Sequence, residues 1–177
     1  YIKHEIQYDK FFKDSEHIYR TISHRKYDNN YTDFPSTLYG VADEISSDVP
    51  EIESVTRIFR FHQNYVFSGE SFYGEYSYHY VDSAFFDVFS FKVLQGTPAK
   101  FLDEPNKVVL TASVAEAIFG TSSPLGEEVV IDEKNFEVIG VMEDPPAQSH
   151  LKFDLLLSMN SYTQDYLEMM GSDFHTY

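Results

Sequence analysis

The amino-acid sequence predicts an α+β fold in which mixed β-sheets are combined with short helices. Two long segments, residues 52–67 and 71–81, alternate apolar and polar side chains with the period of two that half-buried strands show. Shorter stretches keep the spacing of an amphipathic helix and end near a proline or a glycine. The chain has 177 residues, of which 42% are hydrophobic and 17% aromatic, so it can bury a core without disulfide bonds.

The first third of the chain predicts several short elements. Residues 8–14 indicate a short helical piece, and residues 17–23 alternate in the manner of a half-buried strand. Residues 25–34 are rich in side chains that favour turns and predict a polar loop. A helix is expected within residues 35–50, because proline suits the first turn and also stops a helix. The strand at 17–23, this helix and the strand at 52–67 follow one another in the sequence. This order suggests a parallel βαβ-like pairing of the two strands.

The middle of the chain predicts two steps from a strand into a helix. The strand at 71–81 leads into a short helix at residues 84–89. The apolar strand at 108–110 is followed by a helix with an apolar face that ends at Gly120. Candidate capping residues are Asp82 or Ser83 for the first helix and Thr111 or Ser113 for the second.

The last third predicts a hairpin, a strand and a helix. Residues 127–132 and 136–143 read as two strands joined by the short turn 133–135. After a proline-containing loop, residues 151–159 indicate a further strand, and residues 162–170 a closing helix.

The charge distribution restricts the class of partner. The net charge is −16, with six Lys or Arg against five Asp or Glu in residues 1–30, and seven against 24 in residues 31–177. A surface of this kind repels polyanions, so nucleic acid is not expected as a partner. Only the near-neutral start could lie against anionic lipid headgroups without strong repulsion. The chain has no cysteine, which excludes disulfides, thiolate metal sites and thiol nucleophiles.

The sequence offers no catalytic, metal or cofactor motif. The glycine-containing stretch 119–132 has Glu127 and Glu128 where a phosphate-binding loop needs lysine and a hydroxyl residue, so it predicts a structural turn. The seven histidines form no local ligand pair, and no serine lies in a nucleophile elbow. We therefore predict no catalytic residue, no bound metal and no cofactor.

Aromatic residues are the candidates for a partner surface. The strand within 71–81 carries Tyr76, Tyr78 and Tyr80 at alternate positions, which could form an exposed platform. The competing interpretation is that these tyrosines pack over one face of the sheet. A second candidate group comprises Phe85, Phe86 and Phe89, for which core packing is the favoured role.

Four segments in a fixed order resemble a known family. They are "YDKFFKDSEHIYR", "YVDSAFFDVFSFKVLQG", "EPNKVVLTASVAEAIFG" with "PLGEEVVI" after it, and "FEVIGVMEDPPAQSHLKFDLLLSM". Their order and spacing resemble the MacB-like periplasmic core domain of FtsX-type ABC transporter permeases, in the form common in Bacteroidota-like bacteria. The resemblance implies a Porter-like α/β part at residues 1–81 with 151–177, and an inserted Sabre-like β-rich part at 82–150. The family usually continues beyond the last segment, so residues outside this chain are expected to complete the Porter-like part.

The resemblance also implies a function. The domain would be a non-catalytic part of a permease at the periplasmic face of the bacterial inner membrane, where it transmits ATP-driven movement to a periplasmic substrate or partner. The implied partners are the flanking transmembrane helices, a second permease copy, a separate cytoplasmic ATPase subunit or domain, and a periplasmic adaptor or lipoprotein. Two alternatives stay open: a secreted module that binds glycan or peptide through the tyrosine strand, and an acidic hydrolase.

Overall fold

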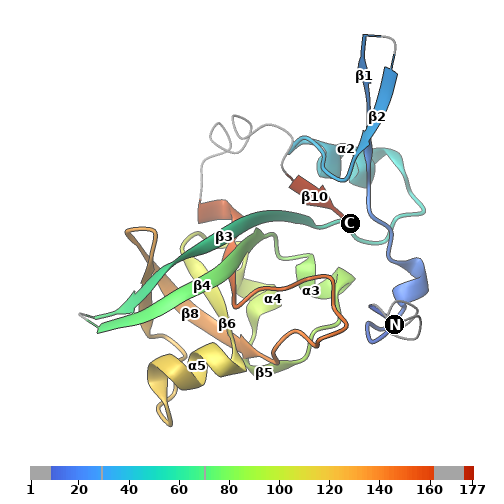
Figure 1. Ribbon diagram of the computed structural model, residues 1–177. Helices are drawn as coiled ribbons and strands as arrows, with labels where there is room; N and C mark the ends of the chain where they lie inside the picture. The colour runs from blue at the N-terminus through green and yellow to red at the C-terminus, as the bar shows by residue number, and fades with distance from the viewer. Residues whose placement is uncertain (1–8, 29, 70, 162–173) are drawn as a thin grey trace.

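The computed structural model describes residues 9–28, 30–69, 71–161 and 174–177 (Figure 1). The helical elements are η1 (Ser15–His17), α2 (Val41–Asp48), α3 (Phe85–Val88), α4 (Pro98–Phe101), α5 (Ala112–Phe119) and η2 (Met159–Ser161). The strands are β1 (Ser23–Tyr27), β2 (Asn30–Phe34), β3 (Arg57–Ser68), β4 (Ser71–Val81), β5 (Val93–Gly96), β6 (Lys107–Thr111), β7 (Glu128–Ile131), β8 (Lys134–Met142), β9 (Leu155–Ser158) and β10 (Phe174–Thr176).

Six strands pair in a closed ring, in the order β3, β4, β9, β6, β8, β7 and back to β3. The pairs β4–β9 and β6–β8 are parallel and the other four are antiparallel. β10 extends the sheet at the start of β3, and β5 extends it at the end of β8. The structure therefore confirms a mixed α+β fold with short helices and extensive sheet.

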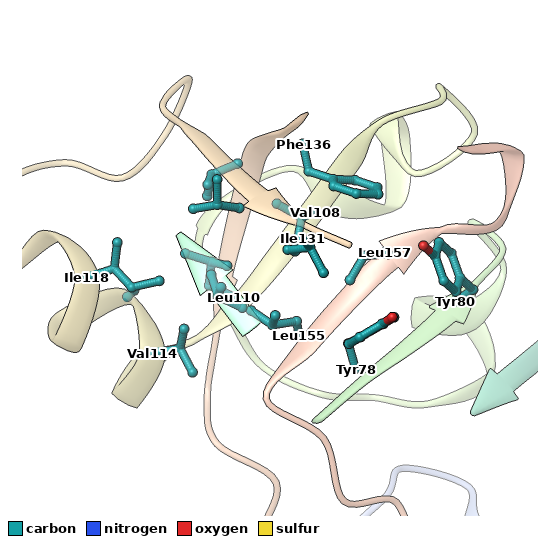
Figure 2. Close-up of a cluster of buried hydrophobic side chains, with 14 of the residues drawn as sticks. Tyr78, Tyr80, Val108, Leu110, Val114, Ile118, Ile131, Phe136, Leu155 and Leu157 are labelled. Atoms are coloured by element: carbon teal, nitrogen blue, oxygen red, sulfur yellow. The ribbon is translucent and has the colours of Figure 1, made fainter. Parts of the chain in front are cut away.

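Alternate side chains of the ring enter two hydrophobic clusters. Every ring strand contributes to the first cluster, which therefore fills the interior of the ring, and α5 adds Val114 and Ile118 (Figure 2). The second cluster lies on the outer face, where α3, the loop after it and the N-terminal turns cover the sheet. In β9, Leu155 and Leu157 enter the first cluster and Leu156 the second. Burial on both faces explains why this strand is a continuous apolar run.

Several expected elements are confirmed. The two long strands form β3 and β4, and the apolar strand forms β6. Helix α5 ends at Gly120, whose φ of +58° is a conformation that glycine adopts easily. The hairpin β7–β8 also forms, but its turn lies at Asp132 and Glu133, one residue earlier than predicted. Both residues have positive φ, as in the tight two-residue turns that match strand twist.

The N-terminal expectations were partly wrong. Residues 9–14 form turns rather than a helix, and the strand expected at 17–23 is absent before Ser23. The polar loop expected at 25–34 lies within the β1–β2 hairpin instead. Nearly all residues of β2 are exposed, so no apolar alternation marks that strand. Helix α2 begins at Val41, later than expected. The parallel βαβ-like pairing is absent among the described residues, because β3 pairs antiparallel with β4, β7 and β10.

Of the four proposed caps, Thr111 stands at an N-cap, although its side chain makes no capping hydrogen bond. Neither α3 nor α5 has a side-chain cap, and Ala84 and Thr111 stand at their N-caps. The Asp82 carboxylate instead accepts hydrogen bonds from Thr56 and Arg57, and Ser113 donates its N–H and hydroxyl to Asp144. The helix expected at 162–170 falls outside the described residues.

Strands assigned to the two predicted parts share one hydrogen-bonded ring. β9, from the predicted Porter-like part, pairs with β4 of the same part and with β6 of the predicted Sabre-like part. The division at residues 1–81 with 151–177 and 82–150 stays a prediction.

Candidate functional site

The predicted tyrosine surface is largely inside the protein. Tyr78 and Tyr80 are 1% exposed each and lie beside Leu155 and Leu157 in the interior of the ring (Figure 2). Their rings meet edge to face with centroids 5.8 Å apart. At this level of burial they have no surface to offer a partner. Tyr76 is half-buried, and a role for it in an interface stays a prediction.

The phenylalanine group also packs into the protein. Phe85 and Phe89 are fully buried in the second cluster, and Phe86 is half-buried against it. Phe89 contacts aromatic residues from both ends of the chain: its ring centroid lies 5.1 Å from that of Phe12 and 5.1 Å from that of Tyr177. These contacts point to a place where the ends of the described chain meet the body.

We call this place the junction and define it as Asp9, Phe12, Phe89, His150 and Tyr177. Phe12 is 3% exposed, so the turns at 9–14 are held to the body by a buried ring. The Asp9 N–H donates to the Gln148 carbonyl at 3.1 Å, and the Asp9 carboxylate accepts from the His150 N–H at 3.0 Å and from its imidazole. The N-terminal turns are therefore fixed by apolar and polar contacts together.

The polar side of the junction forms a short chain of groups. A carboxylate can only accept, so His150 Nδ1 donates to Asp9. His150 Nε2 lies 3.0 Å from the Tyr177 hydroxyl, and the oxygen of that hydroxyl accepts a hydrogen bond from Arg60 Nη2 at 3.5 Å. The Asp9 and His150 side chains are 29% and 28% exposed, so water screens this pair only in part.

A half-buried imidazole, that of His175, lies next to this chain of groups. Burial, followed by the positive charge of Arg60, lowers the pKa of His175 to about 4. His175 Nδ1 and Arg60 Nε are both buried and have no hydrogen-bond partner among the described residues. His175 is therefore neutral near pH 7.

A cavity of about 460 Å³ adjoins the junction. It is lined by all five junction residues and by Ser15, Ile18 and Arg20. The N-terminal turns therefore face the rest of the domain partly across this cavity and partly through packed aromatic rings.

A buried ion pair fixes the start of β3 to the end of β4. Arg57 Nε lies 3.1 Å from Asp82, and the two side chains are 14% and 16% exposed. Burial raises the pKa of Asp82, although hydrogen bonds from Thr56 and Arg57 act in the opposite direction. Arg57 also reaches the exposed Asp43 of α2 at 3.2 Å and stacks over the Tyr39 ring at 4.4 Å. Through these two contacts, Arg57 connects α2 and Tyr39 to the ring near β10.

Within the described ranges, no cluster of three or more His, Asp or Glu is placed to hold a metal ion. Over the same residues, no helix has the length and apolar character that crossing a bilayer requires.

The sequence matches the family model described as the MacB-like periplasmic core domain over residues 1–174. The chain belongs to this family. A curated relative, the macrolide export ATP-binding/permease protein MacB of Aggregatibacter actinomycetemcomitans, is 34% identical over 84 residues, which are 46% of this chain and 12% of that protein. The MacB-like domain therefore corresponds to a small fraction of the length of this relative.

Solved structures share the fold of this MacB-like domain. A domain assigned to a permease of Porphyromonas gingivalis aligns with a TM-score of 0.73 and 22% identity, over 81% of this chain and 68% of that one. The periplasmic region of MacB from Actinobacillus actinomycetemcomitans gives 0.62 and 23%, over 80% and 64%. The extracellular domain of the noncanonical ABC-type transporter YknZ from Gram-positive bacteria gives 0.62 and 19%, over 80% and 72%.

Sequence reasoning did not find the junction. Asp9 and His150 are 141 residues apart, and a lone aspartate and a lone histidine give no local signal. Phe12 and Phe89 lie in two of the segments that carry the family resemblance, so their aromatic character was visible although their contact was not.

Proposed function

We propose that this MacB-like domain is the extracytoplasmic part of an ABC transporter permease, on the periplasmic side of the inner membrane. In this role it has no catalytic activity of its own and passes ATP-driven movement from the membrane helices to a periplasmic substrate or partner. Family membership supports the permease context, and the junction supports the route of the movement.

The observation that carries this proposal is the attachment of residues 9–14 to the body. Phe12 and Asp9 fix the N-terminal turns to Phe89 and His150, and both phenylalanines belong to the second cluster, on the outer face of the ring. A closed ring of strands around a packed interior resists internal deformation. A displacement applied to the start of the chain would therefore move the whole ring rather than bend one strand.

The proposed partners follow from this role. They are the transmembrane helices that flank the domain, a second permease copy, a cytoplasmic ATPase, and a periplasmic adaptor or lipoprotein. The secreted glycan-binding alternative loses its main support, because Tyr78 and Tyr80 have no exposed surface on which a sugar could stack.

A spin-label experiment on the full-length permease with its ATPase tests the proposal. Ser122 is exposed, and the 177-residue chain has no cysteine, so Ser122→Cys introduces a single labelling site into this domain. We expect ATP binding to change the distance between the labels of two permease copies. Phe12→Ala should reduce this change, while Phe11→Ala, at a neighbouring ring that is 41% exposed, should retain it.

The two possible failures are distinguishable. If the distance between the labels does not change on ATP binding in the permease that carries Ser122→Cys alone, the proposed function is wrong. If they move equally in Phe12→Ala, the domain moves but the junction does not carry the movement.

A further inference from the structure

The far end of the β3–β4 hairpin extends beyond the strands that pair with its base. β9 pairs only with Tyr78–Val81 of β4, and β10 only with Arg57–Phe59 of β3. From Phe59 to Phe67 the strand advances about 26 Å at about 3.3 Å per residue. Figure 1 shows the far ends of β3 and β4 on the opposite side of the domain from α2 and β10.

Three aromatic side chains are exposed at this end. Tyr65, Phe67 and Phe72 are 51%, 38% and 57% exposed. The Phe72 ring centroid lies 5.5 Å from those of both Tyr65 and Phe67. Between them in sequence, Val66 is fully buried, so the inner face of the strand already supplies the core. Folding does not require aromatic residues on the outer face, and such a group indicates an interaction site.

Strand register places acidic residues on the same outer face. Residues directly opposite in an antiparallel pair share a face, and Glu75 lies opposite Tyr65. On the other side, Phe67 lies opposite Val130 of β7, and Glu128 is two residues from Val130. Glu75 and Glu128 are exposed. The Glu75 carboxylate is close enough to raise the pKa of Tyr65 through a hydrogen bond.

We call this surface the tip patch and define it as Tyr65, Phe67, Phe72, Glu75 and Glu128. We propose that the tip patch docks a polypeptide partner whose surface offers an apolar pocket bordered by lysine or arginine. Aromatic side chains supply most of the binding energy in such contacts, and complementary charge at the border gives orientation and a faster encounter.

The charge of the tip patch disfavours two other binding partners, a lipid surface and a second copy of this chain. An anionic lipid surface would be repelled by Glu75 and Glu128. A second copy is disfavoured because residues 31–177 hold seven Lys or Arg against 24 Asp or Glu, so the body of another chain presents the same sign. The docking proposal does not rest on the movement proposed above, since it concerns a separate surface.

Binding of designed peptides to the 177-residue chain tests the proposal. The probe is an amphipathic peptide of leucine and lysine, and its matched counterpart is a peptide of leucine and glutamate of the same length. We expect the lysine peptide alone to bind. Phe72→Ser should weaken its binding about tenfold or more, as loss of an aromatic anchor does. Tyr65→Ser and the double variant Glu75→Gln with Glu128→Gln should also weaken it.

Leu38→Ser is the control, because Leu38 is 58% exposed and lies outside the tip patch. Equal weakening by Leu38→Ser, or unchanged binding in Phe72→Ser and Tyr65→Ser, would overturn the proposal. So would binding to vesicles of phosphatidylethanolamine and phosphatidylglycerol that Phe72→Ser abolishes, since the patch would then bind lipid. A dimer in sedimentation that Phe72→Ser disperses would instead assign the patch to a second copy and overturn it as well.

Discussion

Replacing Phe12 by alanine separates the attachment of the N-terminal turns from the stability of the ring. Phe12 is 3% exposed, and its ring centroid lies 5.1 Å from Phe89 and 5.0 Å from Phe91. Truncating a buried phenylalanine to alanine costs about 3–5 kcal/mol. The junction adjoins a cavity of about 460 Å³, so the site is less enclosed than a central core position and the lower end applies. We expect a loss of about 3 kcal/mol in the free energy of unfolding.

Urea unfolding and native-state hydrogen exchange measure this effect. If the turns detach before the ring unfolds, amide exchange should accelerate at residues 10–18, while β6 and β9 keep most of their protection. Phe11→Ala is the matched control, because Phe11 is 41% exposed and its truncation should cost about 1 kcal/mol or less. Equal losses in the two variants, or a loss below about 1 kcal/mol for Phe12→Ala, would refute the assignment of Phe12 as the anchor.

Three further predictions concern a half-buried histidine, the Arg57–Asp82 ion pair and a glycine in β5. The pKa of His175 is about 4 in the folded chain and near 6.5 when unfolded, so the unfolded state binds the extra proton and stability should fall as pH drops from about 6.5 to 4. Allowing for partial solvent access, this amounts to about 1–2 kcal/mol, and pH-dependent denaturation of His175→Gln should lack that part of the slope. Asp82→Ala should lower the free energy of unfolding in urea by about 3 kcal/mol, because it leaves Arg57 buried without its main partner. Asp43→Ala, at a carboxylate that is 69% exposed, should lower it by less than about 1 kcal/mol. Equal losses in the two variants would contradict the role of burial. Gly96→Ala would place a Cβ atom 2.1 Å from the Ile139 carbonyl oxygen, so its thermal midpoint should drop well below that of Gly126→Ala, where φ is also positive but no atom lies within 4 Å.

Local signals in the sequence were sufficient for the elements that depend on neighbouring residues. Apolar alternation marked β3 and β4, and the glycine at position 120 marked the end of α5. The β7–β8 hairpin was visible because two β-branched runs flank a short polar segment. These features depend on the periodicity of apolar side chains and on local backbone preferences, both of which can be seen in a single sequence.

Closure of the ring was not predictable from local signals. It depends on β9 reaching both β4 and β6, and on β7 reaching β3, which are pairings between distant segments. The β1–β2 hairpin was missed because its residues are polar on both faces, so no burial pattern separates a strand from a loop. Tertiary context decided these cases.

Buried and exposed aromatic residues of the β3–β4 hairpin could not be told apart from the sequence either. An alternating strand reveals that one face is buried but not which one, and Tyr78 and Tyr80 proved to be on the buried face. The exposed aromatic residues Tyr65, Phe67 and Phe72 belong to the same hairpin and look similar in the sequence. Only the register with β7 and β9 separates the two groups.

The position of β9 in the chain bears on how the domain matures. β4 and β6 are both complete long before residues 155–158 are synthesised, yet both need that strand as a neighbour. Until it emerges, each presents a row of unsatisfied backbone groups and apolar side chains, the kind of edge that recruits other chains. Closure of the ring is therefore expected to be a late step governed by long-range contacts. Any shortening of the chain before Leu155 would leave two open edges and a product prone to aggregation.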